Sequence, residues 1–88
     1  MIIGRVVGTV VCTKKVDELT GFKLLLVRKT DVDGTPGNDT VVAVDLVGAG
    51  DGETVLLVSG SSSRQTSRTD KKPVDAAIIG IIDAVTVS

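Results

Sequence analysis

The side chains of this sequence that could carry out catalysis are few. The 88 residues include no histidine, tyrosine or tryptophan, and Cys12 is the one cysteine. Serine and cysteine nucleophiles are normally activated by a histidine, and zinc sites are built mainly from histidine and cysteine. Because Cys12 lies within an apolar strand-like run, we interpret it as a small core residue. The sequence therefore predicts no catalytic residue, no cofactor and no metal site.

The glycine-rich segment VGAGDGE, residues 47–53, has the chemistry of a phosphate-binding loop only in part. Gly48 and Gly50 match the first two glycines of a dinucleotide motif, but Glu53 stands where the third is required. The residues that follow, TVLLV, are typical of a strand, so no helix N-terminus is available to bind a pyrophosphate. We interpret Gly48 and Gly50 as structural glycines of a tight connection between two strands.

A short basic cluster lies between the glycine-rich segment and the C-terminus. Its members are Arg64, Arg68, Lys71 and Lys72, with Asp70 among them. Binding of single-stranded nucleic acid normally needs aromatic side chains that stack on the bases, and Phe22 is the only aromatic residue here. The formal net charge is −1, which does not attract a polyanion. We interpret the cluster first as a solvated loop face and second as a contact for an acidic partner.

Short β-strands must position these groups. Runs of β-branched residues separated by turn residues predict strands over 2–12, 22–29, 41–47, 54–59 and 81–87. The strands 41–47 and 54–59 are expected to pair as a β-hairpin, and residues 31–39 have turn chemistry throughout. Pro73 and Gly80 bracket a segment that could form about two turns of helix over 73–79. The expected fold is all-β: a small five-stranded OB-like barrel with one short helix before the last strand, forming a single domain over residues 1–88.

The chain is apolar for its size, with 42% hydrophobic residues. No apolar run approaches the ~18 residues of a membrane-spanning helix, and the sequence opens into a strand without a charged leader. The first strand is apolar on both faces, so its second face, which includes Val7 and Val11, is expected to pack against another subunit. A lone cysteine fits a reducing cytoplasm. The sequence therefore predicts a cytoplasmic oligomer with no membrane segment.

Four segments in this order resemble the vertex proteins of bacterial microcompartments, the CcmL/EutN family. They are MIIGRVVGTVVCT, LTGFKLLLVR, VVAVDLVGAGDGETVLLVSGSSSR and PVDAAIIGIIDAVTV. The resemblance covers essentially the whole chain and implies an OB-like barrel that assembles as a homopentamer. Such pentamers cap the five-fold vertices of a polyhedral shell, in a carboxysome or a catabolic metabolosome, and their partners are hexameric shell proteins. An OB-fold nucleic-acid-binding domain is the alternative function.

The resemblance also suggests roles for the loop that follows residue 59. Five copies of one segment meet at a five-fold axis, so the residues there should be small and uncharged. We therefore expect Ser61, Ser62 and Ser63 to line the central channel, with Gly60 turning the backbone toward the axis. Arg64 should point back to the subunit body and bind a carboxylate or backbone carbonyls. The alternative places this loop at the outer rim, with solubilising serines.

Two positions depart from the family pattern. Family members often have alanine in place of Ser63 and glutamine near Arg28. The change at Ser63 keeps a small volume, so we expect no change in assembly. Arg28 adds a charge that could alter what the pentamer meets at its rim.

Overall fold

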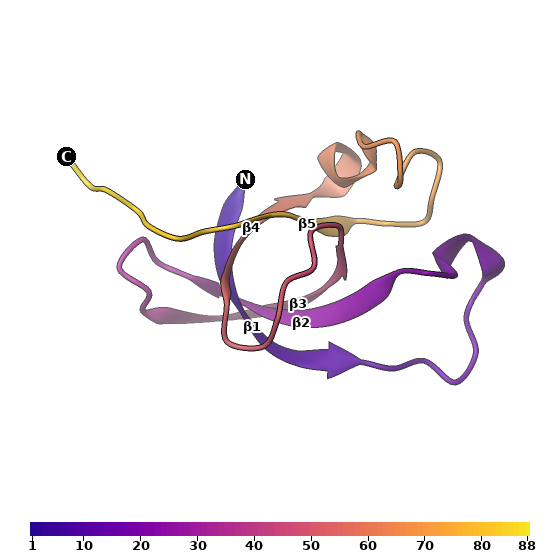
Figure 1. Cartoon of the computed structure of the whole chain (residues 1–88), viewed down its shortest axis with the longest axis horizontal. Helices are drawn as coiled ribbons and strands as arrows, with labels where there is room; N and C mark the ends of the chain where they lie inside the picture. Colours follow the sequence, from indigo (N-terminus) through magenta and orange to yellow (C-terminus); the bar gives the residue numbers. More distant parts are fainter.

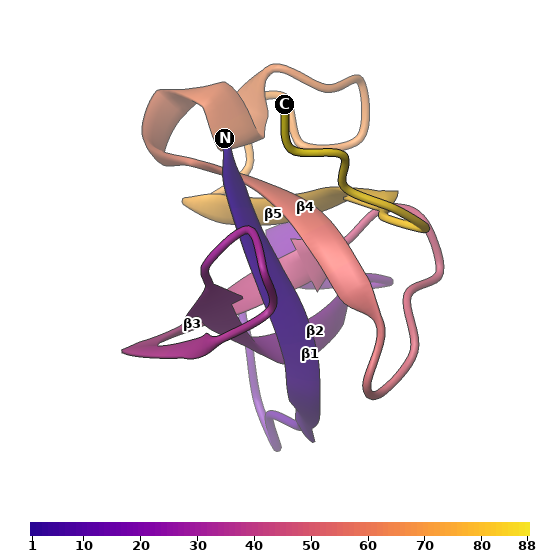
Figure 2. The same cartoon turned by 90° about the vertical axis from the view of Figure 1, so that its left-hand side faces the viewer.

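The computed structural model describes residues 1–88 and contains five β-strands and two short 3₁₀ helices. The strands are β1 (Ile2–Val10), β2 (Lys23–Thr30), β3 (Pro36–Asp45), β4 (Thr54–Ser59) and β5 (Ala76–Ile81). The 3₁₀ helices are η1 (Asp17–Leu19) and η2 (Gly60–Arg64). The strands wrap around a ring in Figure 1, and Figure 2 shows β1 and β4 crossing the front of the barrel below η2.

The barrel is closed, with strand order β1-β2-β3-β5-β4 and a final pairing of β4 with β1. All neighbouring strands are antiparallel except β3 and β5, which are parallel. A five-stranded barrel of this kind is the OB-like architecture expected from the sequence, so the all-β prediction is confirmed. None of the helical segments has the length and apolar character needed to cross a bilayer.

The predicted hairpin between residues 41–47 and 54–59 is wrong. Both segments are strands, but β5 lies between them and pairs with each. The connection between β3 and β4, residues 46–53, instead makes hydrogen bonds to β1. The Val6 amide donates to the Glu53 carbonyl at 3.0 Å, and the Gly52 amide donates to the Val6 carbonyl at 2.9 Å. Ala49 of this connection is buried in the core. The connection therefore covers one end of the barrel and does not close a two-stranded ribbon.

The predicted helix over 73–79 and the predicted strand over 81–87 are both wrong. The fifth strand is Ala76–Ile81, and residues 82–88 lie outside the strands. The helical element that precedes the last strand is η2, at Gly60–Arg64. Local helix signals are a weak preference, and burial decides here: Ala77 and Ile78 are fully buried between non-local partners.

Two apolar clusters stabilise the barrel. The inner cluster fills the barrel and consists of Val6, Leu25, Val27, Ala43, Ala49, Val55, Leu57, Ala76 and Ile78. The second cluster consists of Val44, Val58, Val74 and Ala77, and Phe22 and Leu24 pack against it. The end of β3 at Ala43–Asp45 and the strands β4 and β5 thus contribute buried residues to both clusters, whereas the outer face of β1 has no such cover.

The end of β1 and the turn that precedes β3 also differ from expectation. Strand β1 ends at Val10, so Cys12 is exposed and the prediction of a core cysteine is wrong. The turn before β3 spans only 31–35, because β3 already begins at Pro36. Within it the Asp33 carboxylate accepts a hydrogen bond from the Thr35 amide at 2.9 Å, and this bond lowers the pKa of Asp33 below its ordinary value of 3.8.

The Asp45 side chain shapes the chain as it leaves β3. This carboxylate is only 7% exposed, and one of its oxygens accepts hydrogen bonds from the amides of Val47 and Gly48, each at 3.1 Å. We expect Asp45→Ala to lower the free energy of unfolding by about 1–3 kcal/mol, because two amides lose their acceptor. Urea unfolding should show a smaller loss for Asp45→Asn, which keeps an acceptor oxygen. Equal losses for the two variants would show that these bonds do not carry the effect.

Candidate functional site

The chain turns sharply where β4 passes into η2. Gly60 has a φ of +61°, in the left-handed region that glycine adopts most readily. A Cβ at this position would meet no atom within 4 Å, so backbone conformation and not space accounts for glycine here. The Gly60 amide donates to the Asp75 carbonyl at 2.8 Å and ties the start of η2 to the residue before β5.

Ser63 holds the turn from inside. Its side chain is 0% exposed, and its hydroxyl lies 2.6 Å from the Gly60 carbonyl oxygen and 3.0 Å from the Val74 carbonyl oxygen. The single hydroxyl proton is thus directed between two carbonyls of the same subunit. A side chain that is fully buried in its own subunit cannot line a channel, so the prediction for Ser63 is wrong.

The outward surface of η2 is small and uncharged. Ser61 and Ser62 are exposed, whereas the Arg64 guanidinium donates to the Val74 carbonyl at 2.9 Å. Val74 therefore anchors η2 through both Ser63 and Arg64. The arginine is directed toward its own subunit and leaves two hydroxyl-bearing residues as the exposed part of the turn.

The outer face of β1 presents apolar surface that its own chain does not cover. Val7 is 43% exposed, and Val11 is 88% exposed. Val11 lies in the connection after β1 and not within the strand. The assignment of both valines to a subunit interface remains a prediction, and their exposure makes them available for it.

The glycine-rich connection is a structural turn. Gly48 has a φ of +79°, and the Gly50 amide donates to the Glu53 carboxylate at 2.6 Å. The chain then enters β4 and not a helix. The amide of Gly50 is thus bound by an acidic group of the same loop, and the arrangement is not that of a phosphate-binding loop.

The basic cluster is partly engaged by the rest of the chain. The Arg68 guanidinium donates to the Leu46 carbonyl at 3.3 Å and lies 5.7 Å from the centre of the Phe22 ring. This cation–π contact occupies the one aromatic ring that a nucleic acid base could stack on. Nowhere in the chain do three or more histidine, cysteine, aspartate or glutamate side chains gather as a metal site would require.

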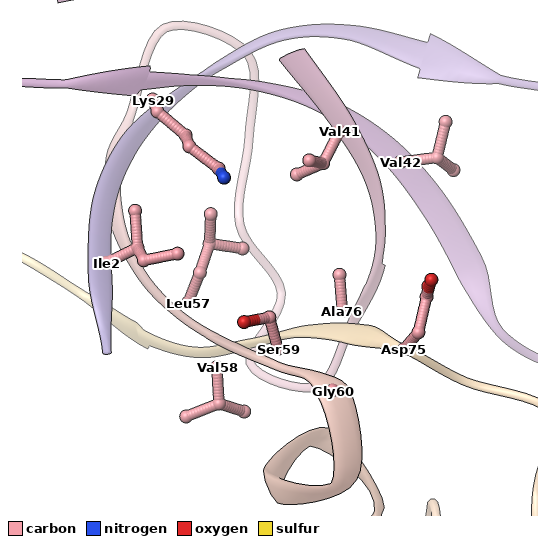
Figure 3. Close-up of a pocket in the computed structure, with 10 residues that line it drawn as sticks. All are labelled: Ile2, Lys29, Val41, Val42, Leu57, Val58, Ser59, Gly60, Asp75 and Ala76. Carbon is pink, nitrogen blue, oxygen red and sulfur yellow. The ribbon is translucent and has the colours of Figure 1, made fainter. Parts of the chain in front are cut away.

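An open cleft lies between β3 and the segment that leads into β5, and sequence reasoning did not identify it. Its volume is about 480 Å³. Figure 3 shows Leu57 and Val41 pointing into it, with the ammonium group of Lys29 directed toward its interior. Val42 and Ala76 also line a smaller hollow of about 180 Å³ beside it, which reaches Leu24 and Val44. No local pattern could have signalled the cleft, because it arises where two strands distant in sequence diverge.

Comparison with known proteins places the chain in a family. Residues 1–83 match the family model described as ethanolamine utilisation protein EutN/carboxysome. The microcompartment shell vertex protein GrpN of Rhodospirillum rubrum is 47% identical over 97% of this chain and 96% of its own length. The carboxysome shell vertex protein CcmL of Gloeobacter violaceus is 49% identical over 99% of this chain and 87% of its own length.

A solved structure extends the similarity to three dimensions. The pentameric microcompartment shell protein GrpN from Rhodospirillum rubrum superposes with a TM-score of 0.91, at 44% identity and with all of both chains covered. Since the sequence match, the OB-like barrel and this superposition agree over nearly the full length, the chain belongs to the EutN/CcmL family of microcompartment shell vertex proteins.

Proposed function

We propose that this protein forms a homopentamer that caps the five-fold vertices of a bacterial microcompartment shell within the cytoplasm. The observation that carries the proposal is the superposition on a pentameric shell protein over all of both chains. The uncovered apolar face at Val7 supports it, because a cyclic ring needs one face of each subunit to pack on a different face of the next. The role is structural, in keeping with relatives named as shell vertex proteins.

Native mass spectrometry tests the assembly directly. We expect the purified protein at micromolar concentration to have five times the mass of the 9.0 kDa chain. A spectrum containing only monomer or dimer would contradict the proposal. We also expect no appreciable binding to short single-stranded DNA at low salt, where electrostatic binding is strongest. Appreciable binding there would favour the alternative of a nucleic-acid-binding barrel.

The proposed partners are hexameric shell proteins that tile the flat facets. A pentagon inserted among hexagons introduces curvature that a hexagonal sheet lacks, so shell closure depends on the vertex protein. We expect co-expression of facet proteins without this chain to yield sheets, tubes or shells with open vertices in electron micrographs. Adding the chain should restore closed shells. Closed shells of normal permeability in its absence, with no related vertex protein present, would contradict the capping role.

We further propose that Ser61 and Ser62 face the five-fold axis and that Ser63 supports the turn from within. The exposed hydroxyls and the inward direction of Arg64 support this arrangement, because charged groups would repel one another where five copies meet. Gly60 and Ser63 then set the direction of the turn and do not themselves line the channel.

Disulfide cross-linking tests the channel assignment. In a Cys12→Ser background, Ser62→Cys should give covalent dimers on mild oxidation, because neighbouring copies of residue 62 meet around the axis. Five single thiols in a ring can form two pairs, so we expect dimers and monomers but no longer ladder. Ser67→Cys, at an exposed position in the following loop, serves as the control and should remain monomeric. A pentamer in which Ser62→Cys gives no dimer would place the turn away from the axis.

A further inference from the structure

The barrel has an incomplete seam between β3 and β5. These strands pair only at Val44 with Ala77 and at Asp45 with Ile78. On the side of β3 away from β2, residues 36–43 have no partner strand, and none of the backbone hydrogen bonds outside the regular elements involves them. The cleft lies beside this edge, since Val41 and Val42 line it. An unpaired strand edge next to an apolar cleft can accept an additional strand.

The C-terminal segment is an unpaired strand-like element of the same chain. After the bond from the Ile82 amide to the Thr54 carbonyl at 2.8 Å, residues 83–88 make no further backbone hydrogen bond. The segment leaves the barrel and ends away from its body (Figure 1). Val85 and Val87 are 43% and 74% exposed. In an extended segment they share one face, with Thr86 on the other, which is the pattern of a half-buried strand.

The cleft beside β3 and the C-terminal segment match in polarity and charge. The cleft presents apolar side chains from four strands, and the valine face of the tail is apolar. The half-buried Lys29 directs its ammonium group toward the cleft interior (Figure 3). Asp83 lies on the same face of an extended tail as Val85 and is the one carboxylate side chain of residues 82–88. Asp75 is exposed at the rim of the cleft, where water screens it.

We propose that residues 83–88 of one subunit add as a strand to the free edge of β3 in the neighbouring subunit, with Val85 and Val87 seated in its cleft. This inference rests on the proposed pentamer and deepens it, because it names the two different surfaces that a cyclic ring requires. Backbone hydrogen bonds along residues 36–43 hold the added strand, and the valines select its register. Each subunit both donates a tail and receives one, so the contacts close around the ring.

Disulfide trapping tests the contact in the intact protein. In a Cys12→Ser background, Val41→Cys, whose side chain points into the cleft (Figure 3), is combined with Val85→Cys in one variant and with Val87→Cys in a second. Mild oxidation of at least one of them should give a ladder that reaches the covalent pentamer on a denaturing gel. The matched control combines Val41→Cys with Thr86→Cys, on the opposite face of the tail, and should give little cross-linking. If both test variants remain monomeric after oxidation, or match the control, the inference is overturned.

Native mass spectrometry of each variant separates this inference from the proposed function. A pentamer without cross-links contradicts the tail contact alone, whereas the absence of a pentamer in the unmodified protein contradicts the proposed function itself. Charge substitution gives an independent measurement. Val85→Asp should raise the protein concentration at which the pentamer dissociates by about tenfold or more, and Thr86→Asp should have less effect. Equal effects of the two substitutions would count against a valine face in the cleft.

Discussion

The variant Gly4→Ala is expected to lose about 3 kcal/mol of its free energy of unfolding, near the upper end of the range for overpacking a core. A Cβ at Gly4 would lie 2.6 Å from the Cγ1 of Val27 and 2.9 Å from the backbone oxygen of Arg28. Val27 is fully buried, and a backbone oxygen in a sheet can retreat only if the strand pairing moves. For a small domain such a loss is a large fraction of the total stability.

Gly8→Ala provides a matched control on the same strand. The nearest atoms to a Cβ at Gly8 are 3.7 Å away, which is ordinary van der Waals contact. Since alanine also restricts the unfolded chain, we expect this variant to be unchanged or more stable by about 0.4–1 kcal/mol. Urea unfolding of both variants at one protein concentration measures the difference, because unfolding of an oligomer depends on concentration. Similar stabilities for the two variants would show that β1 can shift outward to admit a side chain.

The variant Val7→Asp is expected to abolish the pentamer while leaving the barrel folded. Val7 is 43% exposed and belongs to neither apolar cluster, so its replacement does not disturb the core. In the proposed ring, however, the new carboxylate would be buried against the next subunit without a partner. An unpaired buried charge costs several kcal/mol, and this cost recurs at each interface of the ring.

Val7→Thr separates the effect of charge from that of shape. Threonine keeps the branched outline of valine and adds only a hydroxyl, so we expect a weakened but detectable pentamer. Circular dichroism should show the same strand content for both variants, and native mass spectrometry should show monomer for Val7→Asp. A pentamer of Val7→Asp at micromolar concentration would place this face outside the interface. Loss of strand content would instead show that Val7 supports the barrel itself.

The residue types that this protein lacks, and the location of most of its strands, could be read from the sequence. The prediction of a strand over 54–59 coincides with β4, because an apolar run is bounded by a glycine-rich connection before it and by Gly60 after it. The missing histidine and the single aromatic residue are properties of composition that no fold can change. The all-β class followed from β-branched runs separated by turn residues, a signal that each segment carries by itself.

Residues 76–81 show where local signals fail. Pro73, Gly80 and the alanines between them favour a short helix, yet Ala76–Ile81 is a strand paired with β4 and β3. Its two faces are buried against residues that lie far away in the sequence. The same insertion of β5 separates β3 from β4 and removes the hairpin that their proximity in sequence suggested.

The sequence by itself determined which residue types are present and the approximate location of four of the five strands, because those properties depend on neighbours a few positions away. Only the tertiary structure decided which strands pair, that Ser63 is buried while Ser61 and Ser62 are exposed, and that a cleft opens beside β3. Each of these depends on contacts between distant segments, and closing the barrel sets all of them together. A strand pattern specifies a face to be buried but not the partner that buries it.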